Sequence, residues 1–392
     1  MNTVRPHIYL NVFRGFAALW VIMFHSSMQF IDGGGLKYFK NPIYAFSSFG
    51  SLGVPMFFVI SGYCIFAAVH SNCLKSGTIK SFAHARIRRI FPPYLAVFAL
   101  TLIVGFFAML HNGSLGRLSK NINISDPLFW ITNLTLSHVP FGQQACVAVS
   151  WSLSYEVTFY GIAAVMIFLS SRVVISRTPN DRIDKVSKMN FMLTVVSLIW
   201  LLIAPHVIFP MDRWYQFGLG GQMFFLIESI FNKKIKSIKS RRIELILTML
   251  MVITFSFFTT QNTGVNGLFE GHILVHPHPT TREDAIVCLL TCIAIGLTFR
   301  KVPFEPTNVI YRIFSWLGNI SYSLYLTHMI FLPFIIVMMV RIGFKNDLYW
   351  VTLLTCIFTT VGAATVFYKV IEEKFLNSKT RPQNLNSISN NG

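Results

Sequence analysis

Two ionisable residues, Arg14 and His25, stand inside the first apolar stretch of the chain, at about residues 10–30. In an α-helix their separation is about 20° more than three full turns, so both belong to one face, about 16 Å apart along the axis. A charge inside a membrane span is costly and points to function. A snorkelling arginine and a satisfied core histidine would explain each residue alone, but their shared face favours a functional pair.

Three arginines, Arg86, Arg88 and Arg89, lie just before the apolar stretch at about 90–110. Arginine presents a planar fork of donors that suits phosphate oxygens, so the cluster could bind an anion. The same cluster could be a topology signal of the kind found in cytoplasmic loops. The cluster alone does not separate the two interpretations.

Glu156 closes the run Trp151-Ser152-Leu153-Ser154-Tyr155-Glu156 at the start of another apolar stretch. A carboxylate here could orient a histidine and stabilise its imidazolium, or accept a hydrogen bond from a sugar hydroxyl. It could also be a carboxylate favoured by the dipole at a helix start. Trp151 and Tyr155 could be ordinary aromatics of the membrane interface.

Two further ionisable residues fall within apolar stretches. His328 ends Ser321-Tyr322-Ser323-Leu324-Tyr325-Leu326-Thr327-His328, whose hydroxyl groups could form a site or join neighbouring helices. Glu228 stands near the end of its stretch, and we expect it to pair with a nearby lysine.

The elements that position these residues follow from composition. Of the 392 residues, 53% are apolar and only 12% are charged, with 38 phenylalanines and a mean hydropathy of +0.57. An average soluble domain has about twice that share of charge. The composition excludes a cytosolic globular enzyme, a disordered chain and a small disulfide scaffold, and it predicts an all-α, polytopic membrane protein.

A spanning helix needs about 20 mostly apolar residues. Ten stretches qualify, at about 10–30, 48–69, 90–110, 151–170, 190–209, 214–231, 243–260, 284–299, 313–338 and 349–370. The chain has 33 basic against 15 acidic residues. Of the basic residues 24 fall on the side that holds both termini and 8 on the other, which predicts cytoplasmic N- and C-termini.

The six cysteines include no Cys-x-x-Cys pair, and Cys288 and Cys292 have no histidine or acidic neighbours that would complete a metal site. We interpret all six as small apolar side chains of the core. No metal site is predicted.

Six ordered motifs carry a resemblance that extends from about residue 8 to 375. In this order the motifs resemble the membrane-bound acyltransferase 3 family, whose members O-acylate bacterial surface polysaccharides. They are Arg14-x10-His25, Phe57-Phe58-Val59-Ile60-Ser61-Gly62-Tyr63, Arg86/Arg88/Arg89 followed by Phe91-Pro92, the run ending at Glu156, the run ending at His328, and Val370-Ile371-Glu372.

The resemblance implies a role for each group of residues. Arg14, Arg86, Arg88 and Arg89 would bind the phosphates of cytoplasmic acyl-CoA, a co-substrate rather than a permanently bound cofactor. His25 would be catalytic, as general base on a sugar hydroxyl or as carrier of the acyl group, and Glu156 would orient or balance it. The substrate-binding residues would be Ser61, Tyr63, Trp151, Ser154, Tyr155 and His328.

The expected protein is therefore a multi-pass enzyme of the bacterial cytoplasmic (inner) membrane that works on a glycan or lipid-linked glycan, such as O-antigen or exopolysaccharide. On family frequency the acyl group is acetyl. Residues 8–375 would form the membrane domain, 376–392 a disordered cytoplasmic tail, and the form would be the stand-alone one without an SGNH domain. Membrane lipid is expected as a partner and nucleic acid is not.

Two other classes of membrane protein share some of these features. A transporter or flippase also carries intramembrane Arg, His and Glu, but the repeats typical of transporters are not evident here. A non-catalytic membrane scaffold would not need the Arg14/His25 face.

Overall fold

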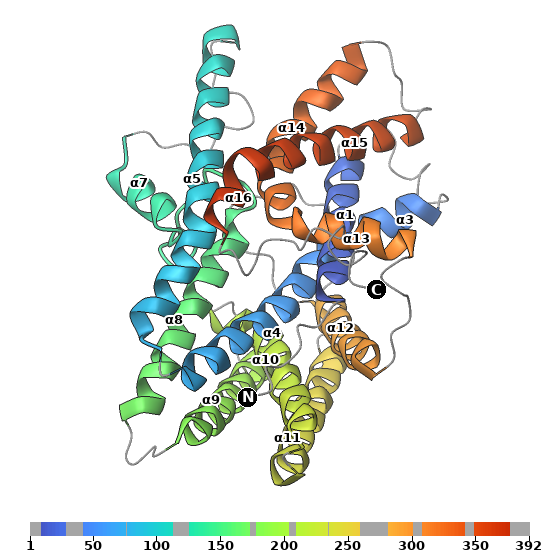
Figure 1. Ribbon diagram of the computed structural model, residues 1–392. Coiled ribbons are helices and arrows are strands. Elements are labelled where there is room, and N and C mark those ends of the chain that lie inside the picture. The colour runs from blue at the N-terminus through green and yellow to red at the C-terminus, as the bar shows by residue number, and fades with distance from the viewer. Residues whose placement is uncertain are drawn as a thin grey trace, which may run out of the picture.

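The computed structural model describes a helical membrane protein (Figure 1). It covers residues 9–28, 42–75, 77–112, 125–172, 178–203, 209–233, 235–258, 281–300, 308–341 and 349–376. Among these residues there is no β-strand, which confirms the all-α class. The tail predicted at 376–392 lies outside the described residues, apart from Leu376.

Each of the ten apolar stretches contains helix. The helices are α1 (Leu10–Met28), α3 (Pro42–Ser48), α4 (Gly53–Leu74), α5 (Ile79–Asn112), α7 (Pro127–Leu134), α8 (Ser150–Arg172), α9 (Pro179–Ile203), α10 (Met211–Phe231), α11 (Ile235–Phe258), α12 (Arg282–Arg300), α13 (Val309–Asn319), α14 (Ser321–Arg341), α15 (Tyr349–Phe367) and α16 (Glu373–Phe375). A π-helical turn, Tyr368–Glu372, joins the last two.

The ninth stretch, at 313–338, differs from the prediction because it is two helices. The chain breaks at Ile320 between α13 and α14. At about 1.5 Å per residue the 11 residues of α13 are too short to cross a bilayer. The spanning part of this stretch therefore begins at Ser321.

Six of the described helices are long and apolar enough to cross a membrane. They are Gly50–Leu74, Ile79–Leu110, Ser150–Ser171, Pro179–Ile203, Ser321–Met339 and Trp350–Phe375. A multi-pass membrane protein is thereby confirmed. The count of ten spans and the cytoplasmic side of the termini stay predictions.

Helices α4 and α10 form the centre of the packing and lie side by side (Figure 1). They approach closely because glycines face backbone at the crossing. A Cβ on Gly62 would collide with the carbonyl oxygen of Phe217, and one on Gly220 with that of Val59. Small residues of this kind let membrane helices pack tightly.

The first turn of α14 is held from two sides. Asn11 of α1 donates a hydrogen bond to Asn319 Oδ1 over 2.8 Å, just before α14 begins. Buried Glu372, in the π-helical turn, accepts a hydrogen bond from Ser323 N (3.1 Å) and another from the Ser323 hydroxyl. A carboxylate suits this place because the first N–H groups of a helix have no partner within it. The position of α14 against α1 is thereby fixed.

Candidate active site

A cavity opens between α1, α4, α5, α8 and α14. Its polar wall combines three arginines, one glutamate, three serines, three tyrosines and a cysteine, and its apolar wall comes mainly from α4. The polar lining residues are Arg14, Ser61, Cys64, Arg86, Arg89, Ser152, Glu156, Tyr160, Ser321, Tyr322 and Tyr325. The structure thus brings together Arg14, Ser61, two residues of the arginine cluster and Glu156.

Helical spacing decides which arginines of α5 reach the cavity. Arg86 and Arg89 are three residues apart, share a face and line the cavity. Arg88 is on another face and is exposed, so the structure does not bring it to the cavity as the sequence prediction had it. Arg86 also lies over the ring of Tyr160, 5.6 Å from its centroid.

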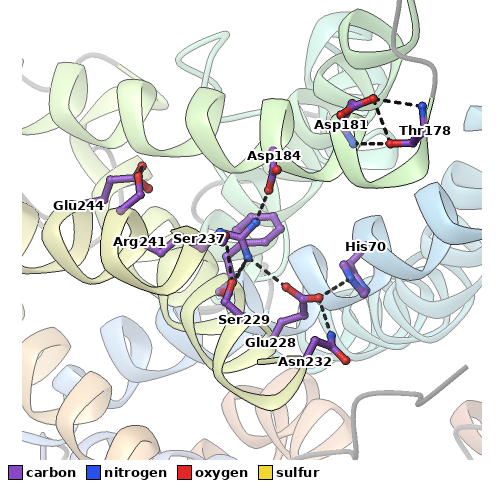
Figure 2. A network of polar contacts seen from close by, with 12 residues as sticks. His70, Thr178, Asp181, Asp184, Glu228, Ser229, Asn232, Ser237, Arg241 and Glu244 are labelled. Atoms are coloured by element: carbon purple, nitrogen blue, oxygen red, sulfur yellow. Dashed lines mark hydrogen bonds and ion pairs between the residues drawn. The ribbon is translucent and has the colours of Figure 1, made fainter. Parts of the chain in front are cut away.

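The cavity arginines differ from the buried arginines elsewhere in the described chain. Arg241 bonds Asp184 Oδ1 (2.6 Å) and Glu228 Oε2 (3.0 Å), as Figure 2 shows. Arg213 Nη1 lies 3.6 Å from Asp284 Oδ2.

Within the described residues Arg14, Arg86 and Arg89 form no such ion pair. The Nε of Arg86 is a buried donor without a partner there. With three arginines against one glutamate, the walls carry a formal charge of +2, which suits an anion.

Glu228 belongs to the network in Figure 2. Its described partners are Arg241 and His70, whose Nε2 lies 3.3 Å from Glu228 Oε1, together with Asn232. This group of contacts joins α4, α9, α10 and α11, and the expected pairing of Glu228 with a lysine stays a prediction.

Glu156 has partners from two helices. It accepts a hydrogen bond from Ser61 of α4 (2.9 Å) and one from Tyr160 (2.6 Å), both at Oε1. Ser152, Glu156 and Tyr160 are four residues apart and so form one stripe of α8 that faces the cavity. Glu156 and Glu372 are also near enough to Arg14 and Arg89 to attract them electrostatically.

Three predicted substrate-binding residues of α8 lie off this stripe. Tyr155 is fully buried and donates to Asp212 Oδ2 over 2.7 Å. Trp151 stacks under Arg213, 5.2 Å from the ring centroid, and Ser154 is buried. The structure therefore places Trp151, Ser154 and Tyr155 outside the cavity lining.

Tyr63 is likewise outside the cavity. It is two residues beyond Ser61, which in a helix is the opposite side of α4, and it packs edge-on against Phe224 of α10. The close approach at Gly62 is to α10 as well. Of the Ser61-Gly62-Tyr63 motif only Ser61 reaches the cavity.

His25, in the last turn of α1, lies beside His328 of α14. Their ring centroids are 5.0 Å apart, and the ring of His328 is 5.8 Å from that of Tyr325, a residue of the cavity wall. The two histidines therefore lie behind the cavity wall, and Tyr325 connects His328 to the lining. The hydroxyl of Tyr325 is held by Ser152 Oγ (2.8 Å) and Val149 O (3.2 Å).

The segment before α8 is a folded loop rather than an open connection. Asn133, in α7, donates to Gln144 O (2.9 Å) and accepts from Cys146 N (2.8 Å). His138 is buried beneath this loop, with its Nε2 3.4 Å from Ser150 Oγ. Burial lowers the pKa of His138 to about 4. Asn133 holds this loop closed through its two hydrogen bonds.

Sequence reasoning missed Tyr160, Tyr322 and Cys64 as cavity residues. Tyr160 is four residues after Glu156, so helical spacing could have identified it. Tyr322 donates to Ile90 O of α5 over 2.8 Å, a contact between distant segments that spacing does not reveal. Cys64 lines the cavity and is not fully buried, unlike the other five cysteines.

The helical bundle defines a multi-pass membrane protein, and its cavity has a positively charged lining. Residues 7–369 match the family model described as Acyltransferase domain, Acyl_transf_3. The chain belongs to this acyltransferase family.

Two curated relatives carry provisional names of the same kind. A Staphylococcus aureus (strain COL) protein named as an O-acetyltransferase is 25% identical over 348 residues, covering 83% of this chain and 50% of the relative. A Bacillus subtilis (strain 168) protein named as a peptidoglycan O-acetyltransferase is 23% identical over 397 residues, covering 97% and 56%. The chain thus spans about half the length of these relatives. No solved structure matches it.

Proposed function

We propose that this protein is a membrane O-acyltransferase that moves an acyl group, with acetyl as the first candidate, from acyl-CoA to a hydroxyl group of a cell-surface or exported glycan. Membership of the acyltransferase 3 family supports the class of reaction. Acyl-CoA is inferred as the donor from the cavity, whose three arginines form no ion pair with any described residue. The distribution of basic residues supports a position of this cavity at the cytoplasmic face of a bacterial inner membrane.

The phosphates of CoA are the groups that this lining suits. Arginine forms bidentate, charge-assisted hydrogen bonds to phosphate oxygens. Arg86 and Arg89 come from α5 and Arg14 from α1, so one polyanion would join the two helices. Val54, Phe57 and Phe58 give the cavity an apolar side for the pantetheine arm and the acyl chain.

The transfer itself needs a base near the acceptor hydroxyl. In our account His25 takes the hydroxyl proton while the oxygen attacks the thioester carbonyl. The new C–O bond forms, the C–S bond breaks, and His25 returns the proton to the leaving CoA sulfur. Glu156 balances the arginines and fixes Ser61 and Tyr160 through its hydrogen bonds.

The acceptor is defined only as a hydroxyl-bearing glycan. O-antigen and exopolysaccharide follow from the family resemblance, and the name of the Bacillus relative adds peptidoglycan as a candidate. The names of the two curated relatives describe O-acetylation, so we expect the product to be an acetyl ester.

The test is transfer of radiolabelled acetyl groups from acetyl-CoA by the purified protein in nanodiscs, offered these glycans in turn. We expect a base-labile acetyl ester with the wild-type protein and none with His25→Ala. Ester formation that survives in His25→Ala removes the catalytic assignment. Solute uptake by reconstituted vesicles without any acyl transfer would favour the transporter class instead.

A further inference from the structure

The ring of His328 is fixed by the backbone of its own helix. Its Nδ1 lies 2.7 Å from Tyr325 O and 3.2 Å from Leu324 O. A carbonyl oxygen only accepts hydrogen bonds, so Nδ1 must carry the hydrogen. The neutral ring therefore presents an unprotonated Nε2, which is an acceptor.

That acceptor has no partner. His328 is completely buried, and within the described chain its Nε2 makes no hydrogen bond. A buried acceptor without a donor is unfavourable, so we expect a donor to reach this nitrogen during function.

The ring of His25 lies beside that of His328 and has an N–H that can donate. The two ring centroids are 5.0 Å apart and the planes are inclined by 40°. The χ2 torsion of histidine is broad, so a small rotation of the His25 ring turns an N–H toward His328.

Glu156, the partner that the sequence suggested for His25, is engaged elsewhere. Its described hydrogen bonds are to Ser61 and Tyr160, and it faces the arginines of the cavity.

We propose that His328 is the positioning partner of His25: its Nε2 accepts a hydrogen bond from the His25 N–H, orients that ring toward the acceptor hydroxyl and stabilises the imidazolium. The inference rests on the proposed function. His328 stays neutral throughout, and the proton moves only from the hydroxyl to the other nitrogen of His25 and then to the CoA sulfur. It thus has the orienting role that a carboxylate has in a catalytic triad.

Two substitutions of nearly equal size separate this role from a structural one. The amide of His328→Gln reaches the place of Nε2 and can accept there. The amide of His328→Asn reaches only the place of Nδ1, so it keeps a bond to Tyr325 O and lacks the acceptor. Melting temperatures of both variants check that the full-length protein folds.

The experiment measures kcat and KM for acetyl-CoA in nanodiscs. We expect His328→Asn to lower kcat about 100-fold and His328→Gln to stay within about tenfold of wild type, with KM unchanged in both. Because His328 acts through His25, the double variant His25→Ala/His328→Asn should be no slower than His25→Ala alone.

Three results would overturn the inference while leaving the proposed function intact: wild-type kcat in His328→Asn, equal losses in both variants, or losses that multiply in the double variant. If Glu156→Gln lowers kcat, and the double variant His25→Ala/Glu156→Gln is no slower than His25→Ala alone, then Glu156 is the positioning partner of His25. A wild-type protein that transfers no acyl group from any acyl-CoA would instead contradict the proposed function itself.

Discussion

Arg86 and Arg88 carry the same charge two residues apart, yet one lines the cavity and the other is exposed. The difference comes from the 100° turn per residue of a helix. Arg88 therefore provides a matched control for Arg86, because replacing either arginine removes the same charge from the protein.

We predict that Arg86→Ala or Arg89→Ala raises the KM for acetyl-CoA at least about tenfold, since a hydrogen bond to a charged group contributes about 1.5–3 kcal/mol. Arg88→Ala is the matched control and should leave KM within about twofold, as an exposed charge contributes little. Steady-state kinetics over a range of acetyl-CoA concentrations measure the KM of each variant. Equal changes of KM in all three variants would indicate that the arginine cluster only sets the membrane topology.

For single residues, the sequence identifies which polar side chains stand in apolar stretches, but it does not identify all of the residues that they contact. Arg14, Ser61 and Glu156 have separate expected roles in the sequence, and the structure brings all three to the lining of one cavity. Trp151 and Tyr155 stand on a second stripe of α8 that looks equally suitable in sequence, and only packing against Arg213 and Asp212 shows that this stripe is outside the cavity.

Element packing gives a second prediction, at the crossing of α4 and α10. Gly62→Ala places a methyl group against the carbonyl oxygen of Phe217, and backbone cannot move aside easily. We expect a loss of about 1–3 kcal/mol in stability.

The control is Gly161→Ala in α8, where an added methyl group meets nothing. That change should be neutral or stabilising by up to about 1 kcal/mol. Thermal unfolding in detergent compares the two, and an unchanged melting temperature in Gly62→Ala would show that the helices do not cross at this glycine.

The loop before α8 gives a prediction for pH. Burial lowers the pKa of His138 from 6.5 to about 4, so between these values the unfolded loop binds more protons than the folded one. Stability is therefore complete above pH 6.5 and falls as the pH drops toward 4, by up to about 3 kcal/mol.

His138→Gln removes the titrating group and can keep a hydrogen bond to Ser150. We expect the melting temperature of the wild-type protein to fall more between pH 7.5 and pH 5 than that of the variant. The same pH dependence in both would contradict this account of His138.

Hydropathy predicted where the helices lie but not where one of them is interrupted. All ten apolar stretches contain helix because burial in lipid requires every backbone group to be bonded within the helix. The break at Ile320 falls inside a continuous apolar stretch, so hydropathy does not mark it. Gly318 and Asn319 are residues typical of a helix end and could have indicated it.

For the whole molecule, composition predicted the class and the charge distribution predicts the orientation. An epitope tag after the C-terminus should be cut by protease in inverted vesicles and protected in right-side-out vesicles. The opposite pattern would place the arginine cavity away from cytoplasmic CoA and contradict the donor assignment.

Cys64 offers the most direct test of the central claim, which is that CoA occupies the arginine cavity. It lines the cavity, whereas the other five cysteines are buried, so a thiol reagent should label it first and Cys64→Ser should remove that label. We predict that CoA slows this labelling in the wild-type protein and in Arg88→Ala, but not in Arg86→Ala. Labelling of Cys64 at the same rate with and without CoA in the wild-type protein would contradict the account.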